Sequence, residues 1–201
     1  MTSSPPPAEH PPFYYDLSSP YAYLAALRVD DVLPVPPRWQ PIAFGALIRE
    51  IGKVPWSLRP DTRRAGVAEI ERRARERGAP PMRWPDGWPD VSYSVLPLRA
   101  VLHAFEHERG RELTLELYRV AFAEGAALND LDVVAGSAGR VGLDADETRA
   151  AVERQELKDR LRVATDAARQ RGVTGVPTVA VGDELFWGDD RLGDAARALA
   201  A

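Results

Sequence analysis

The sequence predicts an α/β fold made of a β-α-β unit, a large all-helical insertion and a closing β-β-α unit. An aromatic run at residues 13–15 leads into a Ser-Ser-Pro junction. Residues 45–170 show helical periodicity with only short apolar runs between loops, and two short strand-like runs near the carboxyl terminus flank Gly182-Asp183. Helices gathered in one block, without alternating strands, indicate an insertion into a smaller sheet domain.

Length, hydrophobic content and charge limit the number of domains and the kinds of partner that this chain can have. The chain has 201 residues, 45% of them hydrophobic, and a formal net charge of -4. This size can bury the core of one domain, or of one domain with a large insertion. Basic residues are interleaved with acidic ones, so we expect no nucleic-acid partner. No stretch approaches the apolar length of a membrane span, and we expect no membrane contact.

The chain contains no cysteine. This count excludes disulfides, catalysis by a thiol of the protein, and zinc or iron-sulfur sites built on cysteine. Any thiol chemistry therefore needs an external thiol. Residues 1–11 are rich in Ser and Pro and lack the basic and apolar regions of a signal peptide, so we expect a disordered tail and a cytoplasmic protein.

The first strand is predicted at the aromatic run that begins at Phe13, and a helix is predicted over 21–33. Between them, Ser18, Ser19 and Pro20 are typical of a helix cap and first turn. Ser19 would then lie at the positive end of a helix, where an anion such as phosphate, carboxylate or thiolate is favoured. The simpler alternative is a plain N-cap, worth about 1 kcal/mol.

Three prolines at 34, 36 and 37 end this helix. Residues 38–43 follow as a second strand, which the nearby prolines confine to a sheet edge. We therefore assign 12–44 to the sheet domain, 45–170 to the helical insertion domain, and 171–201 to the return of the chain to the sheet.

Within the insertion, 62–77 is rich in Arg and Glu and is predicted to be a solvated helix with i,i+4 ion pairs. Further helices are expected at 112–124 and 144–170, the second opening with Asp144 and Glu147 in capping-box spacing. Trp84 and Trp88 lie in a turn-rich loop. They either line a pocket for an aromatic ligand or fix the loop to the core, and the sequence leaves both open.

His103 and His107 belong to an H-x-x-E-H pattern shared with inverted zinc metallopeptidases. The remaining histidine, His10, falls in the tail, and nothing singles out an acid as third ligand. The apolar residues of this helix form an ordinary stripe that faces the core, and this accounts for the sequence of the helix without a metal. We therefore predict no metal site.

At the carboxyl-terminal end, Val176-Pro177 precedes a strand that reaches Val181. Gly182-Asp183 is a two-residue hairpin loop into a strand at 184–187, and Gly188 to Arg191 lead into a last helix.

These motifs resemble those of a known family. Phe13-Tyr14-Tyr15-Asp16 with Ser19-Pro20-Tyr21, Gly175-Val176-Pro177-Thr178, and the run from Phe186 to Leu192 are similar to the 2-hydroxychromene-2-carboxylate isomerases and kappa-class glutathione transferases. Both belong to the DsbA-like branch of the thioredoxin superfamily, so the resemblance implies a thioredoxin-like fold with a helical insertion. Ser19-Pro20-Tyr21-Ala22 stands where redox relatives carry C-P-x-C.

The resemblance implies roles for individual residues. Ser19 would hold the thiol of glutathione as a thiolate, and Val176, before a Pro177 expected to be cis, would pair its backbone with the tripeptide. The cofactor-binding residues implied are Ser19, Pro20, Tyr21, Val176, Pro177, Asp190 and Arg191, the last two at the glutamyl end of glutathione. Our own candidates for the substrate pocket are Tyr21, Lys53, Trp84 and Trp88.

The reaction implied is a cis-trans isomerisation of an aromatic 2-oxo acid in aromatic degradation, by reversible thiolate addition. We expect the enzyme to be a homodimer. The stretch 52–55 often carries Asn in the family, and here it carries Lys53; changes near Thr62-Arg63 add to this departure. The thiol and the substrate therefore stay open. The alternatives are a kappa-type glutathione transferase and a non-catalytic thioredoxin-fold binding module, whereas a disulfide oxidoreductase is excluded because it needs cysteine.

Overall fold

A computed structural model describes residues 10–201. The first nine residues of the expected tail lie outside this range, and His10 and Pro11 lie against the segment that leads into the second strand. The ring Nδ1 of His10 is 2.7 Å from the carbonyl oxygen of Pro36. The backbone N–H of Arg38 donates to the carbonyl of Pro11 at 3.0 Å.

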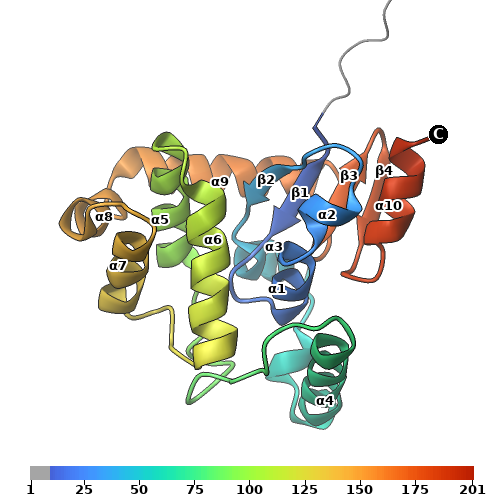
Figure 1. Ribbon diagram of the computed structural model, residues 1–201, viewed down its shortest axis with the longest axis horizontal. Helices are drawn as coiled ribbons and strands as arrows, with labels where there is room; N and C mark the ends of the chain where they lie inside the picture. Colours follow the sequence, from blue (N-terminus) through green and yellow to red (C-terminus); the bar gives the residue numbers. More distant parts are fainter. Residues whose placement is uncertain (1–9) are drawn as a thin grey trace, which may run out of the picture.

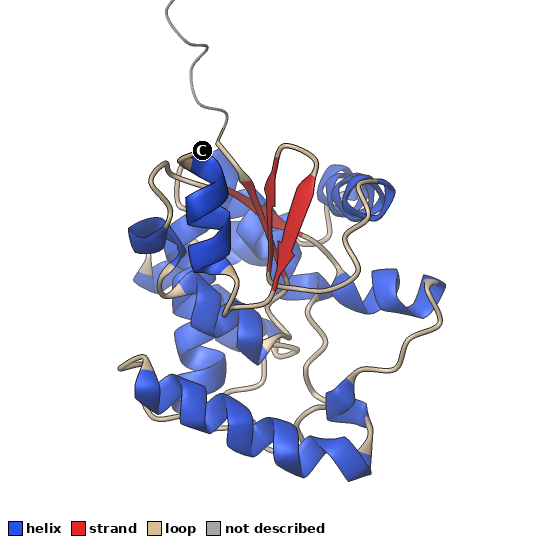
Figure 2. Ribbon diagram, turned by 90° about the vertical axis from the view of Figure 1, so that its right-hand side faces the viewer, coloured by secondary structure: helices blue, strands red, loops and turns tan. Residues whose placement is uncertain are grey.

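Four short strands form one sheet in the order β2-β1-β3-β4, with helices on either side of it (Figure 2). Strands β1 (Pro12–Tyr15) and β2 (Arg38–Pro41) are parallel. Strands β3 (Thr178–Val181) and β4 (Glu184–Trp187) are antiparallel to each other, and β3 is antiparallel to β1. The edge position predicted for β2 from its prolines is confirmed, as is the two-residue loop between Val181 and Glu184.

The predicted helices appear in the predicted order (Figure 1), but three of them differ by more than a residue or two at their ends, and no individual helix was predicted at 44–50, 56–58 or 131–140. In place of the single helix predicted over 21–33 there are two short helices, separated by Leu27 and Arg28. The helix predicted over 112–124 ends in a π-helical turn. The helix predicted over 144–170 is also two, because Arg154 adopts an extended backbone and begins a new helix. The elements are α1 (Pro20–Ala26), α2 (Val29–Val32), α3 (Phe44–Glu50), η1 (Trp56–Leu58), α4 (Pro60–Glu76), α5 (Val95–Glu106), α6 (Gly110–Arg119), η2 (Val120–Glu124), α7 (Leu131–Arg140), α8 (Ala145–Ala151), α9 (Gln155–Gln170) and α10 (Leu192–Leu199).

One main hydrophobic core joins the sheet to the helical block. Phe13 and Tyr15 point into it from one face of β1, whereas Tyr14 points to a smaller core beneath α3, as the two-residue period of a strand requires. The buried hydroxyl of Tyr15 lies 2.8 Å from Oγ1 of Thr114 on α6, and it is the donor because Thr114 gives its own hydroxyl proton to the carbonyl of Gly110. This contact fixes the insertion against the first strand.

Helix α4 projects from the rest of the molecule with η1 beside it (Figure 1). Helix α4 contacts α1, although the two are separated in the sequence. It therefore lies beside the first turn of α1. Within residues 10–201, every helix is too short or too polar to cross a membrane.

Candidate functional site

A cavity of about 570 Å³ opens where the two ends of the chain meet the insertion. It lies between the β1-α1 junction, α3, η1, the loop near Trp88 and the turns around β3 and β4. Most of the residues predicted from the sequence line it: Ser19, Pro20, Tyr21, Lys53, Trp88, Val176, Pro177 and Asp190. The structure therefore brings together residues from the first and last parts of the sequence.

Ser19 is the N-cap of α1. Its backbone is extended, with φ -96° and ψ 114°, and its Oγ accepts a hydrogen bond from the N–H of Ala22 at 3.2 Å. Pro20 fills the first turn, as predicted from its missing N–H. A hydroxyl that accepts one hydrogen bond keeps its own O–H free to donate to another group. The cap role and a ligand role for Ser19 are thus compatible.

A buried carboxylate lies behind this junction. Asp16 Oδ1 accepts from both the N–H and the hydroxyl of Ser18 at 2.8 Å, and Oδ2 accepts from the N–H of Phe44 at 2.7 Å. Burial raises the pKa of Asp16, and these hydrogen bonds oppose that rise. The sequence pointed to Asp16 only as the acid that follows a buried aromatic strand, and its structural role is to fix two walls of the cavity.

The segment around Val176 presents backbone groups at the cavity. The Val176-Pro177 peptide bond is cis, as expected from the family resemblance. Oγ1 of Thr178 donates to the carbonyl of Gly175 at 2.7 Å, which fixes the turn. Within residues 10–201, neither the N–H nor the C=O of Val176 has a hydrogen-bond partner. Such a segment can pair with an extended peptide.

Two acids at the β4-α10 turn have different surroundings. Asp189 is buried and pairs with Arg73, whose Nη1 is 2.6 Å from Oδ1, and with Arg77. Asp190 is exposed at the cavity, and its Oδ2 lies 3.5 Å from Nη1 of Arg73. The prediction that the arginines of 62–77 are solvated is therefore only partly correct. Arg73 and Arg77 instead form ion pairs with Asp189 in this turn.

Arg73 also reaches Tyr21. Its guanidinium carbon lies 5.4 Å from the centre of the Tyr21 ring, within the range of a cation-π contact. Burial raises the pKa of the Tyr21 hydroxyl, and the charge of Arg73 opposes that rise. Tyr21 is therefore held as a neutral phenol between α1 and α4.

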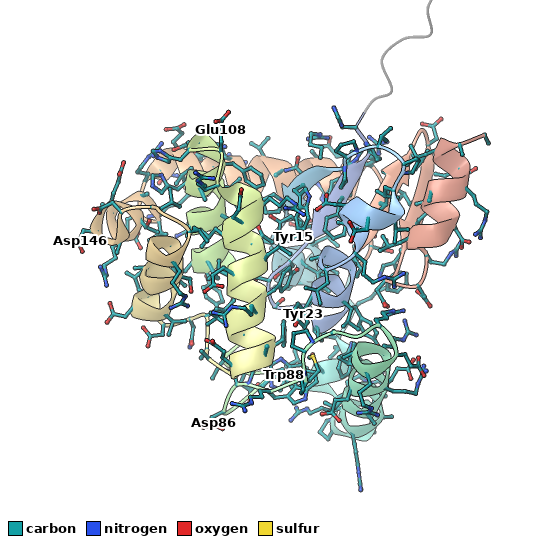
Figure 3. All side chains as sticks on the ribbon, viewed as in Figure 1. Tyr15, Tyr23, Asp86, Trp88, Glu108 and Asp146 are labelled. Carbon is teal, nitrogen blue, oxygen red and sulfur yellow. The ribbon has the colours of Figure 1, made fainter. Side chains whose placement is uncertain are left out.

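Aromatic rings form one side of the cavity. The ring centres of Tyr21 and Trp56 are 6.0 Å apart, and those of Trp56 and Trp88 are 5.7 Å apart. Sequence reasoning missed Trp56, which lies in a short helix without a motif. Figure 3 labels Trp88 between α4 and α6.

Trp84 and Arg191 do not line the cavity, in contrast to their predicted roles. Trp84 packs behind Trp88, with ring centres 4.4 Å apart, and its Nε1 donates to Oε1 of Glu71 at 3.0 Å. The second alternative for this loop, attachment to the core, therefore describes Trp84. Arg191 pairs instead with Asp194 of its own helix.

Lys53 lines the cavity with an exposed side chain, and its ammonium lies 6.0 Å from the ring centre of Trp187. The nearby Thr62 and Arg63 hold η1 in place. Thr62 Oγ1 donates to the carbonyl of Trp56 at 2.9 Å, and Nε of Arg63 donates to that of Ser57 at 2.6 Å. These hydrogen bonds fix the backbone of the short helix that carries Trp56.

Comparisons with known proteins agree on one fold. A family model described as the DSBA-like thioredoxin domain matches residues 12–200. A 2-hydroxychromene-2-carboxylate isomerase from Sphingobium xenophagum is 29% identical over 185 residues, which cover 90% of this chain and 92% of that protein.

Solved structures show the same likeness at lower identity. A 2-hydroxychromene-2-carboxylate isomerase superposes with a TM-score of 0.85 at 22% identity, covering 94% of both chains. A probable DsbA oxidoreductase from Streptomyces coelicolor superposes with a TM-score of 0.71 at 21% identity, covering 95% of this chain and 88% of that one. At such identities the superpositions establish the fold.

Proposed function

The chain belongs to the DSBA-like thioredoxin domain family, and from that premise we propose that it is a thiol-dependent cis-trans isomerase of the 2-hydroxychromene-2-carboxylate isomerase type. Its substrate would be an aromatic 2-oxo acid. The observation that carries the proposal is that Ser19, Val176 and Asp190 line one cavity with an aromatic wall. Similarity to the Sphingobium xenophagum isomerase along 90% of the chain supports the choice of reaction.

The cavity fits a small thiol such as glutathione. Its volume of about 570 Å³ falls within the range of about 300–1,000 Å³ usual for small-molecule sites. Val176 offers an unpaired backbone N–H and C=O to a peptide, and Asp190 offers a carboxylate to an amine. Because Arg191 faces Asp194, we assign the glutamyl end to Asp190 alone. When bound, the thiol supplies the nucleophilic sulfur that adds reversibly to the conjugated double bond of the substrate.

The residues of the chain bind and orient the reactants. The O–H of Ser19 donates to the sulfur, while the N–H of Ala22 keeps Oγ in place. Asp16 accepts hydrogen bonds from the N–H and the hydroxyl of Ser18 and so fixes the turn between β1 and α1. The rings of Tyr21, Trp56 and Trp88 give an aromatic substrate an apolar surface, and the ammonium of Lys53 provides a counter-charge for its carboxylate. Positioning of this kind lowers the barrier without a charged nucleophile on the protein.

The test compares isomerisation rates with and without glutathione in the wild type, Ser19→Ala and Asp130→Ala. Asp130 is the matched control because it caps α7 away from the cavity, accepting from the N–H of Asp132 at 2.8 Å. A hydrogen bond to a charged group is worth about 1.5–3 kcal/mol, so we expect Ser19→Ala to slow the reaction by roughly 10–100-fold. Asp130→Ala should lose a similar cap energy and keep its rate.

Equal rates with and without a thiol would contradict the proposal. A wild-type rate no higher than the uncatalysed rate would favour a non-catalytic binding module, and an unchanged rate in Ser19→Ala would remove Ser19 from the proposed site. The mass of the product separates the two enzymes, because an isomer has the mass of the substrate and a transferase product retains the thiol.

A further inference from the structure

A cluster of possible metal ligands lies outside the cavity. His103 is in the last turn of α5 and His107 is the C-cap of that helix, while Glu147 is in the first turn of α8. One ring nitrogen of each histidine and one carboxylate oxygen of Glu147 all lie within 4.8 Å of one another. The sequence alone led us to expect no metal site here, but the fold supplies Glu147 as a third ligand, and we propose that these three side chains bind a divalent metal ion of the zinc class.

The state of His103 supports this site. The residue is only 2% exposed, and its Nδ1 has no hydrogen-bond partner among residues 10–201. Nδ1 lies 3.5 Å from Oε2 of Glu106, and metal-bound histidines commonly direct their second nitrogen toward a carboxylate, so Nε2 would be the ligand atom. Glu106 is itself held by Arg154 at 2.9 Å.

The donor set suits zinc, and side-chain movements can bring its atoms to the spacing of zinc ligands. Two imidazole nitrogens and one carboxylate oxygen are ligands that zinc accepts, with a water molecule completing the tetrahedron. Bonds of about 2.0–2.2 Å place tetrahedral ligands about 3.4 Å apart. His107 and Glu147 are exposed, so rotamer changes of these two side chains can draw the ligands together around an ion. The buried His103 would stay in place.

The site is remote from the cavity. Helices α5 and α8 lie at the opposite end of the molecule from α10 in Figure 1. Figure 3 labels Glu108 and Asp146, the chain neighbours of His107 and Glu147, at the same end. Since α5 and α8 come from separate parts of the insertion, a metal here would join two helices. We therefore expect it to stabilise the fold and to leave the reaction at the cavity unchanged.

Calorimetric titration of the chelator-treated full chain with zinc chloride tests the proposal. We expect saturation at one equivalent and a rise in the thermal unfolding midpoint. His107→Ala and Glu147→Gln should each weaken binding at least about tenfold and remove the thermal shift. His10→Ala is the control, since His10 lies against Pro36 far along the chain, and it should bind zinc as the wild type does.

Both exposed ligand variants avoid the buried His103, so a failure to fold does not confuse the result. Absence of zinc binding to the wild type would overturn the proposal. Binding of equal strength in the wild type, His107→Ala and Glu147→Gln would also overturn it, because it would place the zinc elsewhere on the protein.

Discussion

Nη1 of Arg73 donates a 2.6 Å hydrogen bond to Oδ1 of Asp189, across 116 positions of the sequence. This contact joins α4, in the insertion, to the turn between β4 and α10. Arg77 pairs with the same buried carboxylate. Because the next residue, Asp190, lines the cavity, the ion pair fixes the position of one proposed thiol contact.

Asp189→Asn should therefore destabilise the protein. Removing one partner of a buried ion pair costs about 3–5 kcal/mol, but Arg73 and Arg77 are 21% and 18% exposed. Water can solvate them in part, so we expect a loss of about 2–3 kcal/mol in the free energy of unfolding, measured by urea denaturation. Asp183→Asn, in the exposed hairpin loop, is the matched control. Equal stability of the two variants would show that the pair contributes little.

Gly66 provides a second test, because the ring of Trp56 lies directly against it. A Cβ atom at Gly66 would be 2.2 Å from Cε3 of that ring, whereas one at Gly136, in α7, would meet no atom within 4 Å. Alanine is favoured over glycine in a helix by about 1 kcal/mol.

Gly136→Ala should thus raise the free energy of unfolding by about 0.5–1 kcal/mol, and Gly66→Ala should lose that gain because the indole must move. Both values follow from urea denaturation, and the tryptophan fluorescence of the folded state should change only in Gly66→Ala. A stability gain of the same size in both variants would contradict the close packing of Trp56.

The pH dependence of stability should report on Asp16. Burial raises the pKa of its carboxyl above the ordinary value of 3.8, so the folded state holds this proton more tightly than the unfolded state. The contribution of Asp16 to stability is then complete below pH 3.8 and is lost as the pH rises through the raised folded pKa.

Urea denaturation between about pH 4 and pH 7 checks this sign. The stability of the wild type relative to Asp16→Asn should fall as the pH rises, since Asn carries no proton to lose. The same comparison with Asp183→Asn should show no such trend. A relative stability that increases with pH would mean that the hydrogen bonds from Ser18 and Phe44 outweigh burial.

The sequence predicted the features that depend on neighbouring residues. Prolines beside β2 excluded it from the interior of the sheet, Ser19 before Pro20 marked a helix start, and Asp144 caps α8 by accepting from the N–H of Glu147 at 2.7 Å. Each of these follows from local backbone chemistry.

The sequence could not predict contacts between residues that are far apart along the chain. Arg73 looks like any other arginine on a charged helix until the fold places Asp189 beside it. In the same way, no pattern links Glu147 to His103, because the two are on separate helices. Contacts of this kind depend on how α4 and α8 pack, and side-chain periodicity does not specify that packing.

Trp84 and Trp88 allow a last, matched prediction, since one ring lines the cavity and the other lies behind it. Trp88→Leu removes an aromatic face, and aromatic contacts are worth about 0.5–1.5 kcal/mol. In the thiol-dependent assay we therefore expect its KM to rise roughly twofold to tenfold. Nε1 of Trp88 has no hydrogen-bond partner among residues 10–201, so this variant loses none.

Trp84→Leu should behave in the opposite way. It loses the hydrogen bond to Glu71, which is worth about 1 kcal/mol, and part of the packing against Phe122, where ring centres are 6.0 Å apart. Its free energy of unfolding should fall by more than that of Trp88→Leu, while its KM should stay at the wild-type value. A KM that rises equally in both variants would contradict a purely structural role for Trp84 and show that it affects substrate binding, either directly or through the ring of Trp88 packed against it.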